Sequence, residues 1–248
     1  MNKETLEKMR QMRLFGMYAA FAANLESSIR ETLTADQMVS LLVASEYDDR
    51  KNRQIERTLK QASFRYAALL EEVDYSVERG MDKNEFLRLA SLDFISEHKD
   101  LFITGPTGTG KSFLATALGY QACRMGHRVL YASTSKLMAH LKMAKAKATI
   151  LAELKKIERM DLFILDDFGL QPLDAGARLI LLDIIEDRHG KRSTMITSQL
   201  PVKNWYEVIG EKTVADAVLD RIVHQSLRLE LSGESLRRKK SLQDNMYH

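Results

Sequence analysis

Cysteine and proline are scarce in this sequence: among its 248 residues there are one cysteine and three prolines. A single cysteine cannot form an internal disulfide framework, which is consistent with a reducing cytosol. We interpret Cys123 as a small buried helix residue rather than a reactive thiol. The few prolines, together with 45% hydrophobic and 29% charged residues, are typical of a helix-rich globular protein and argue against disorder.

Long apolar runs are also missing. No stretch approaches the roughly 18 apolar residues of a membrane span, and no signal-peptide core follows the charged N-terminal residues. We therefore expect a cytoplasmic protein with no membrane partner. A large excess of one charge is absent too, because 37 lysines and arginines face 34 acidic residues for a net charge of +3. Any nucleic-acid binding must then depend on where the cations cluster.

The first part of the chain has helical periodicity and, up to residue 62, contains no glycine or proline except Gly16. Thr34 and Gln37 form a capping-box signature, which predicts that a helix begins there. A charge-mixed linker follows. We expect a small all-helical domain over residues 1–68, which binds DNA or a partner, and a larger domain over residues 69–248.

After Lys99 the pattern changes to short apolar runs separated by helical segments, which is typical of a parallel sheet buried on both faces. Five such runs with intervening helices predict a doubly wound α/β domain, with a five-stranded parallel sheet flanked by helices. The expected strands are Leu101–Thr104, Val129–Ala132, Leu162–Leu165, Thr194–Thr197 and Leu227–Leu231.

The segment GPTGTGKS matches the Walker A pattern and lies between an expected strand and an expected helix, as that motif requires. Glycines let backbone N–H groups converge on phosphate oxygens, and the helix N-terminus adds its positive dipole. Lys111 is expected to reach the β- and γ-phosphates of ATP, and Ser112 to ligate Mg²⁺. The predicted nucleotide contacts are Gly105, Pro106, Thr107, Gly108, Thr109, Gly110, Lys111, Ser112 and Phe113.

A second half of the site is predicted where an apolar strand ends in Asp166 and Asp167. Carboxylates at the carboxyl edge of a sheet face the phosphate crevice. We expect Asp166 to hold Mg²⁺, directly or through water, and Asp167 to orient the attacking water.

The order of motifs places the two halves of the site on non-adjacent strands, with the strand Thr194–Thr197 inserted between them. This strand ends in the polar residues Thr197, Ser198 and Gln199. They are expected beside the γ-phosphate, as a sensor of its presence would be. The alternative is an ordinary polar strand cap.

Together these residues resemble the AAA+ family, and within it the initiator and loader clade that includes DnaC. The segments ILDDFG, ITSQLP and GESLR, in this order after GPTGTGKS, resemble the IstB-like helper ATPases of transposition most specifically. The resemblance implies an ATPase that binds ATP with Mg²⁺. It also implies nucleotide-dependent assembly into a ring or spiral homo-oligomer on duplex DNA, and delivery of a target site to a transposase.

The same resemblance implies roles for single residues. Ser198 or Gln199 stands in the sensor-one position, Arg221 matches the arginine finger that completes a neighbouring subunit's site, and Arg237 matches a tail residue that contacts nucleotide. Two departures from the AAA+ pattern stand out. Asp167 occupies a place where many members have glutamate, so basal hydrolysis is expected to be slow. The segment after the last strand is too short for a full C-terminal lid, so closure must come from a neighbouring subunit or the N-terminal helices.

Two clusters of cations are candidate DNA contacts. Arg50, Arg53, Arg57 and Lys60 share one face of a predicted helix, and Lys142, Lys145 and Lys147 lie in a segment that could line a channel. Each set has a plain alternative as a solvated helix face. Because no aromatic residues interleave with the cations, phosphate contact with weak sequence preference is the expected mode.

Two other functions compete with this hypothesis. A DnaC-like helicase loader would share the ATPase core but would bind single-stranded DNA and a helicase. A small-molecule kinase or signalling GTPase is disfavoured, because the sequence has no NKxD guanine-reading motif and no visible substrate lid.

Overall fold

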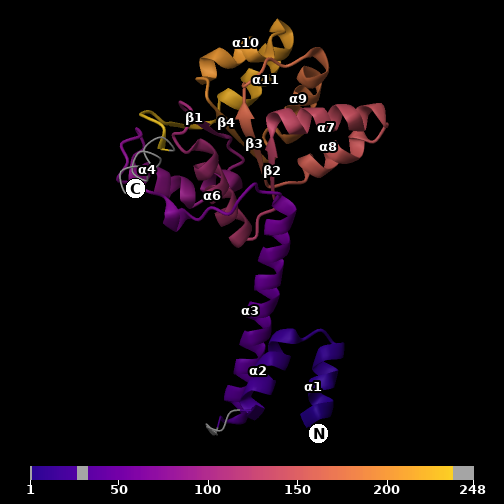
Figure 1. Ribbon diagram of the computed structural model, residues 1–248. Coiled ribbons are helices and arrows are strands. Elements are labelled where there is room, and N and C mark those ends of the chain that lie inside the picture. The colour runs from indigo at the N-terminus through magenta and orange to yellow at the C-terminus, as the bar shows by residue number, and fades with distance from the viewer. Residues whose placement is uncertain (1, 27–32, 237–248) are drawn as a thin grey trace, which may run out of the picture. The chain divides into compact units, whose positions relative to one another are not determined.

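A computed structural model describes residues 2–26 and 33–236 of the chain (Figure 1). The chain forms two compact units, residues 1–57 and 58–248. The division between them falls within helix α3 (Ala35–Ala62).

The first unit is helical. Helices α1 (Asn2–Gln11) and α2 (Phe15–Glu26) precede α3. The predicted capping box is confirmed at the start of α3, where the Thr34 N–H donates to Gln37 Oε1 over 2.9 Å and the Gln37 N–H donates to Thr34 Oγ1 over 3.3 Å. Gly16 lets α2 approach α3 closely, because a Cβ at this position would lie 2.3 Å from the Ser45 carbonyl oxygen.

The second unit is built on a five-stranded parallel sheet with the order β2-β3-β4-β1-β5. The five predicted strands are confirmed, and β3 runs further than expected, through both aspartates. Strand β4 lies between β1 and β3, which confirms the predicted insertion. The strands are β1 (Leu101–Thr104), β2 (Val129–Ser133), β3 (Leu162–Phe168), β4 (Ser193–Ser198) and β5 (Leu227–Glu230).

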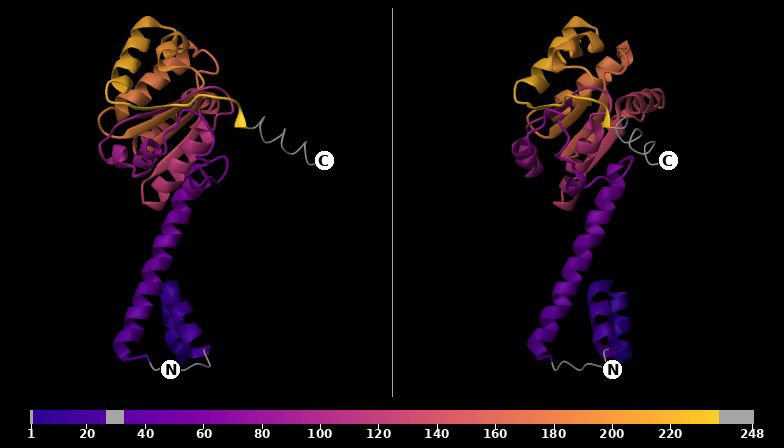
Figure 2. Two further views of the ribbon diagram at one scale, coloured as in Figure 1. Left: turned by 90° about the vertical axis from the view of Figure 1, so that its left-hand side faces the viewer. Right: turned by 60° about the vertical axis from the view of Figure 1, so that its left-hand side comes forward.

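Helices cover both faces of this sheet. Alternate strand residues point to opposite faces, so Phe163 and Leu165 join a core with the helices from α7 to α11, and Leu162 and Ile164 join a core with α4, α5 and α6. Figure 1 and the turned views of Figure 2 show these two helical layers on either side of the strands. The helices are α4 (Lys83–Ala90), α5 (Asp93–Ser96), α6 (Lys111–Arg124), α7 (Thr134–Ala146), α8 (Ile150–Glu158), α9 (Ala175–Arg188), α10 (Trp205–Ile209) and α11 (Lys212–Val223), with 3₁₀ turns η1 (Leu70–Glu72) and η2 (Val202–Asn204).

This topology brings the carboxyl ends of β1, β3 and β4 to one edge of the sheet, where ligands bind in open α/β folds. Over the residues that the structure describes, no helix combines the length and apolar character needed to cross a membrane.

Candidate nucleotide-binding site

The loop between β1 and α6 has the geometry of an anion cradle. Gly105, Gly108 and Gly110 have φ values of 145°, 84° and 95°, which favour glycine. Lys111 is buried, and its Nζ donates to the carbonyl oxygens of Gly105 and Pro106 over 2.8 Å each. The loop therefore wraps around its own lysine at the N-terminus of α6, where backbone N–H groups and the helix dipole favour phosphate.

The segment after β5 packs on this loop. A Cβ at Gly108 would lie 2.1 Å from Ser235 Oγ, and a Cβ at Gly105 would lie 2.4 Å from the Leu231 carbonyl oxygen. The Leu236 N–H also donates to the Gly108 carbonyl oxygen over 2.9 Å. These glycines thus provide space for the tail as well as backbone freedom. Arg237, predicted to contact nucleotide, lies outside the described residues.

Asp166 is the centre of a hydroxyl cluster at the end of β3. Its carboxylate is fully buried, and Oδ1 accepts from Ser112 Oγ over 2.8 Å and from Thr197 Oγ1. Oδ2 accepts from the Tyr131 hydroxyl. Burial, with the hydrogen bond to Asp166, raises the pKa of Tyr131, so the phenol stays protonated and can donate. The predicted pair of Ser112 and Asp166 is brought together across the fold, and Tyr131 was missed by the sequence analysis.

Asp167, the next residue of β3, has a φ of 57°, which is uncommon for a residue other than glycine. Its N–H donates to Thr197 Oγ1 over 3.0 Å. Arg65 Nη1 lies 3.7 Å from Asp167 Oδ2 and 3.9 Å from Asp166 Oδ2. No sequence signal pointed to this cation, because it belongs to a segment interpreted as a linker.

The structure separates the two candidates for the sensor position. Ser198 is fully buried, and its hydroxyl donates to the Phe168 carbonyl oxygen over 2.7 Å and accepts from the Leu200 N–H over 3.1 Å. Its hydroxyl is thus occupied in closing the end of β4. Gln199 is exposed and lines the cleft beside the loop.

Lys111, Ser112, Asp167 and Gln199 line a cleft of about 1010 Å³. Its far wall comes from the segment between α3 and α4, and includes Tyr66 and the buried Arg79. Arg79 Nη2 donates to the Asp74 carbonyl oxygen over 2.9 Å, and desolvation lowers the pKa of Arg79 from its ordinary value. No sequence signal distinguished this arginine from the other charged residues of the linker.

The cleft fits a magnesium–nucleotide complex. Lysine and hydroxyl groups at the start of a helix suit a phosphate chain, and Ser112 with Asp166 offers the oxygen ligands that Mg²⁺ prefers. Among the described residues there is no group of three or more histidine, cysteine, aspartate or glutamate side chains that could hold a metal ion. Such a site would therefore draw further ligands from phosphate and water, as magnesium sites usually do.

Arg221 is not free in the single chain. Its Nη2 lies 2.7 Å from Glu186 Oε1 of α9, and its Nη1 donates to the Ala217 carbonyl oxygen over 2.7 Å.

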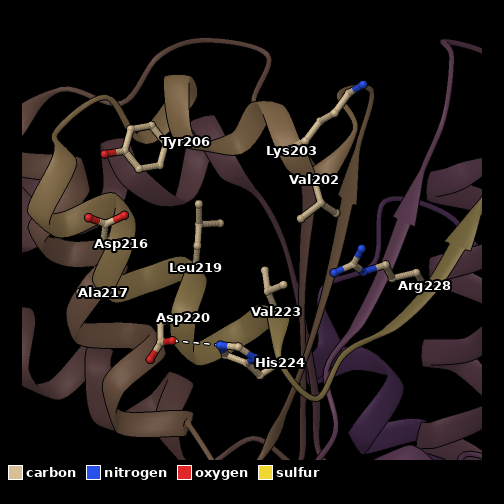
Figure 3. Close-up of a pocket in the computed structure, with 10 residues that line it drawn as sticks. All are labelled: Val202, Lys203, Tyr206, Asp216, Ala217, Leu219, Asp220, Val223, His224 and Arg228. Carbon is tan, nitrogen blue, oxygen red and sulfur yellow. Dashed lines mark hydrogen bonds and ion pairs between the residues drawn. The ribbon is translucent and has the colours of Figure 1, made fainter.

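A separate pocket of about 770 Å³ lies along α11 (Figure 3), where Leu219, Val223 and the Asp220–His224 pair face Arg228 of β5. The described residues that line this pocket include none of those predicted for the nucleotide site.

The predicted basic face of α3 is partly neutralised by its own helix. Arg50 pairs with Glu46, and Arg53 pairs with Asp49 and lies over the Phe15 ring. Within the described chain, no acidic side chain forms an ion pair with Arg57 or Lys60, and both are exposed.

The second cluster of cations lies at the end of α7. Lys142 pairs with Asp174, whereas Lys145 and Lys147 are exposed. Among the described residues, these two lysines are therefore the members of the cluster without an ion pair.

The phosphate loop on β1, the aspartates on β3 and the strand inserted between them define a P-loop nucleotide-binding protein of the AAA+ type. A family model for the IstB-like ATP-binding proteins matches residues 7–244. The chain belongs to this family.

Curated relatives agree with this family. An insertion sequence ATP-binding protein of Sinorhizobium fredii, y4pL, is 45% identical over 94% of this chain and 96% of its own length. The IS1162 ATP-binding protein of Pseudomonas fluorescens is 40% identical over 81% of this chain and 87% of its own length.

Solved structures share the fold. The crystal structure of DnaI has a TM-score of 0.57 at 22% identity, and the match covers 66% of this chain and 90% of the DnaI chain. A structure of the replication initiator DnaA bound to AMPPCP and single-stranded DNA has a TM-score of 0.56 at 20% identity, and covers 71% of this chain and 54% of its own.

Proposed function

We propose that this protein is an ATPase that assembles on duplex DNA in the cytoplasm and helps a transposase to select its target site. The observation that carries the proposal is the contact of 2.8 Å between Ser112 Oγ and Asp166 Oδ1, beside the buried Lys111, in a chain of an insertion-sequence family. The helical first unit would provide DNA or partner contacts. A helicase loader of the DnaC kind is the second candidate, but the relatives at 40% and 45% identity are insertion-sequence proteins.

In this proposal each residue of the nucleotide site has its own role. Lys111 binds the β- and γ-phosphates, and Ser112 and Asp166 hold Mg²⁺. The metal ion neutralises phosphate charge when it is bound. Asp167 orients the attacking water, and Gln199 is the better candidate for the sensor because it faces the cleft. The short reach of Asp167 favours slow basal turnover.

Electron microscopy of the protein with duplex DNA tests the assembly directly. We expect rings or spirals on duplex DNA with a non-hydrolysable ATP analogue, and few or none with ADP. Competition with single-stranded DNA separates the two candidate functions. If single-stranded DNA disrupts the assemblies and duplex DNA does not, the result would contradict the transposition role and favour the helicase loader.

Duplex binding should depend on Arg57 and Lys60, the two exposed cations of the predicted face of α3 for which the described chain shows no ion pair. Replacing both Arg57 and Lys60 with alanine should lower the slope of log affinity against log salt by about 2, because each phosphate contact contributes about 1. Filter binding or fluorescence anisotropy over a range of salt concentrations measures this slope. Arg53 is left intact because it packs on Phe15.

The matched control is Lys51→Ala, which removes an exposed cation from another face of the same helix. A fall in slope of about 1 for this control, the same per charge removed as in the double variant, would mean that DNA responds to net charge and not to the predicted face. An unchanged slope in the double variant would direct attention to Lys145 and Lys147.

Arg221 should complete the site of an adjacent subunit. Phosphoryl transfer needs positive charge at the γ-phosphate, which an arginine supplied in trans can provide. Mixing Arg221→Ala protein, whose own loop is intact, with Lys111→Ala protein, whose arginine is intact, should restore ATPase activity above either variant alone. The Glu186 pair must open for this, so Glu186→Gln should not lower activity. Failure of rescue in verified mixed assemblies would count against this role.

A further inference from the structure

The segment that follows α3 places a cation at the metal end of the cleft. Arg65 Nη1 lies within 3.9 Å of both Asp166 and Asp167, and Arg65 lines the cleft together with Lys111 and Gln199. The proposed function gives this arginine no role. We infer that Arg65 is a ligand of the terminal phosphate, supplied by the same chain, that favours a nucleoside triphosphate over a diphosphate. The inference rests on the proposed ATP site.

The position of the guanidinium marks the end of the phosphate chain. The backbone of the loop suits the inner phosphates, whereas Lys111, Ser112 and the aspartates of β3 mark the place of the outer phosphate and its metal ion. A cation beside these aspartates therefore lies nearer the expected place of the γ-phosphate than that of the inner phosphates. ADP would leave it without that partner.

The contacts of Arg65 leave it available for a ligand. Its distances of 3.7 and 3.9 Å to the carboxylates exceed those of charge-assisted hydrogen bonds, which are about 2.7–2.9 Å. The Asp166 carboxylate already accepts from the neutral hydroxyls of Ser112, Thr197 and Tyr131. Arg65 thus places positive charge beside Asp166 and Asp167 without making a short hydrogen bond to either carboxylate. Its side chain is 43% exposed, so a phosphate can reach it from the cleft.

The backbone that carries Arg65 is anchored. The Phe64 ring packs against Tyr120 and Tyr131, with centroid distances of 4.8 and 5.9 Å. Gly119 of α6 makes room for it, because a Cβ there would lie 2.8 Å from Phe64 Cε1. Tyr131 in turn donates to Asp166. The arginine therefore extends from a base fixed to the same residues that hold the metal-binding carboxylate, which reduces the entropy lost on binding a phosphate.

The test is the ratio of affinities for a non-hydrolysable ATP analogue and for ADP, measured with Mg²⁺ by calorimetry. Arg65→Ala should lower the preference for the triphosphate by about tenfold, the value of one charge-assisted hydrogen bond, and should change ADP affinity by less than about twofold. Arg65→Lys should recover part of the preference, because it keeps the charge without the planar fork.

The matched control is Arg124→Ala. Arg124 is 50% exposed and lies 3.6 Å from Glu71, so it has a similar ion pair, but it does not line the cleft. This control should leave both affinities unchanged. The inference would be overturned if Arg65→Ala left the ratio of affinities unchanged, or lowered the affinities for both nucleotides by the same factor. Neither result would contradict the proposed ATP site. Failure of the wild-type protein to bind either nucleotide would overturn the proposed function as well.

Discussion

Replacing Lys111 with alanine is expected to weaken ATP binding by at least about a hundredfold. The ammonium group is the main side-chain cation of the loop, and a triphosphate taken out of water loses a charge-assisted partner without it. The change also removes the donor to the Gly105 and Pro106 carbonyl oxygens, so the cradle loses its internal support. Calorimetric titration with ATP and Mg²⁺ measures the effect.

Lys203→Ala serves as the control for this experiment, because Lys203 is an exposed lysine of the separate pocket along α11. It should bind ATP like the wild type. Thermal unfolding of both variants establishes that the fold is retained. Undiminished ATP affinity in a folded Lys111→Ala protein would refute the assignment of the site.

Asp167→Asn should lower the ATPase rate by about 10²–10³-fold and leave ATP affinity nearly unchanged. The amide keeps the shape of the side chain but removes the carboxylate that orients and deprotonates water. The variant should therefore remain bound to ATP. Steady-state ATPase assays with saturating duplex DNA, beside a nucleotide titration, separate the two effects.

Two further variants sharpen this prediction. Asp216→Asn removes an exposed carboxylate that lines the pocket along α11 and not the nucleotide cleft. This variant should hydrolyse ATP at the wild-type rate. Asp167→Glu should retain activity, and should exceed the wild type if the short reach of aspartate limits turnover. Full turnover in Asp167→Asn would remove this residue from the mechanism.

The strands and the phosphate loop could be predicted because their signals are local. A buried parallel strand needs a short apolar run, as in Leu162–Leu165, and the loop needs glycines and a lysine at fixed spacing. Even the insertion of β4 between β1 and β3 followed from the order of motifs along the chain. These features depend on neighbours in sequence and on a topology shared by many proteins.

The partners of Asp166 could not be predicted in the same way. Tyr131 reaches the carboxylate from a neighbouring strand, and Arg65 reaches it from a segment that has no regular structure or motif. Ser198 and Gln199 differ by one position, and the local path of the chain at the end of β4 decides which one is buried. Likewise, the partial neutralisation of Arg50 and Arg53 depends on side-chain pairs within the folded unit. Such contacts are set by tertiary packing.

Gly119 cannot be replaced independently of the residues that pack against it. Glycine within a helix costs about 1 kcal/mol relative to alanine, so mutation to alanine would strengthen α6 if nothing opposed it. The Phe64 ring and Ile164 Cδ1 oppose it, each 2.8 Å from the place of an added methyl group. The gain in helix propensity is therefore accessible only if both the Phe64 ring and the end of the Ile164 side chain move away or become smaller. The composition of α6 is thus coupled to the residue preceding Arg65.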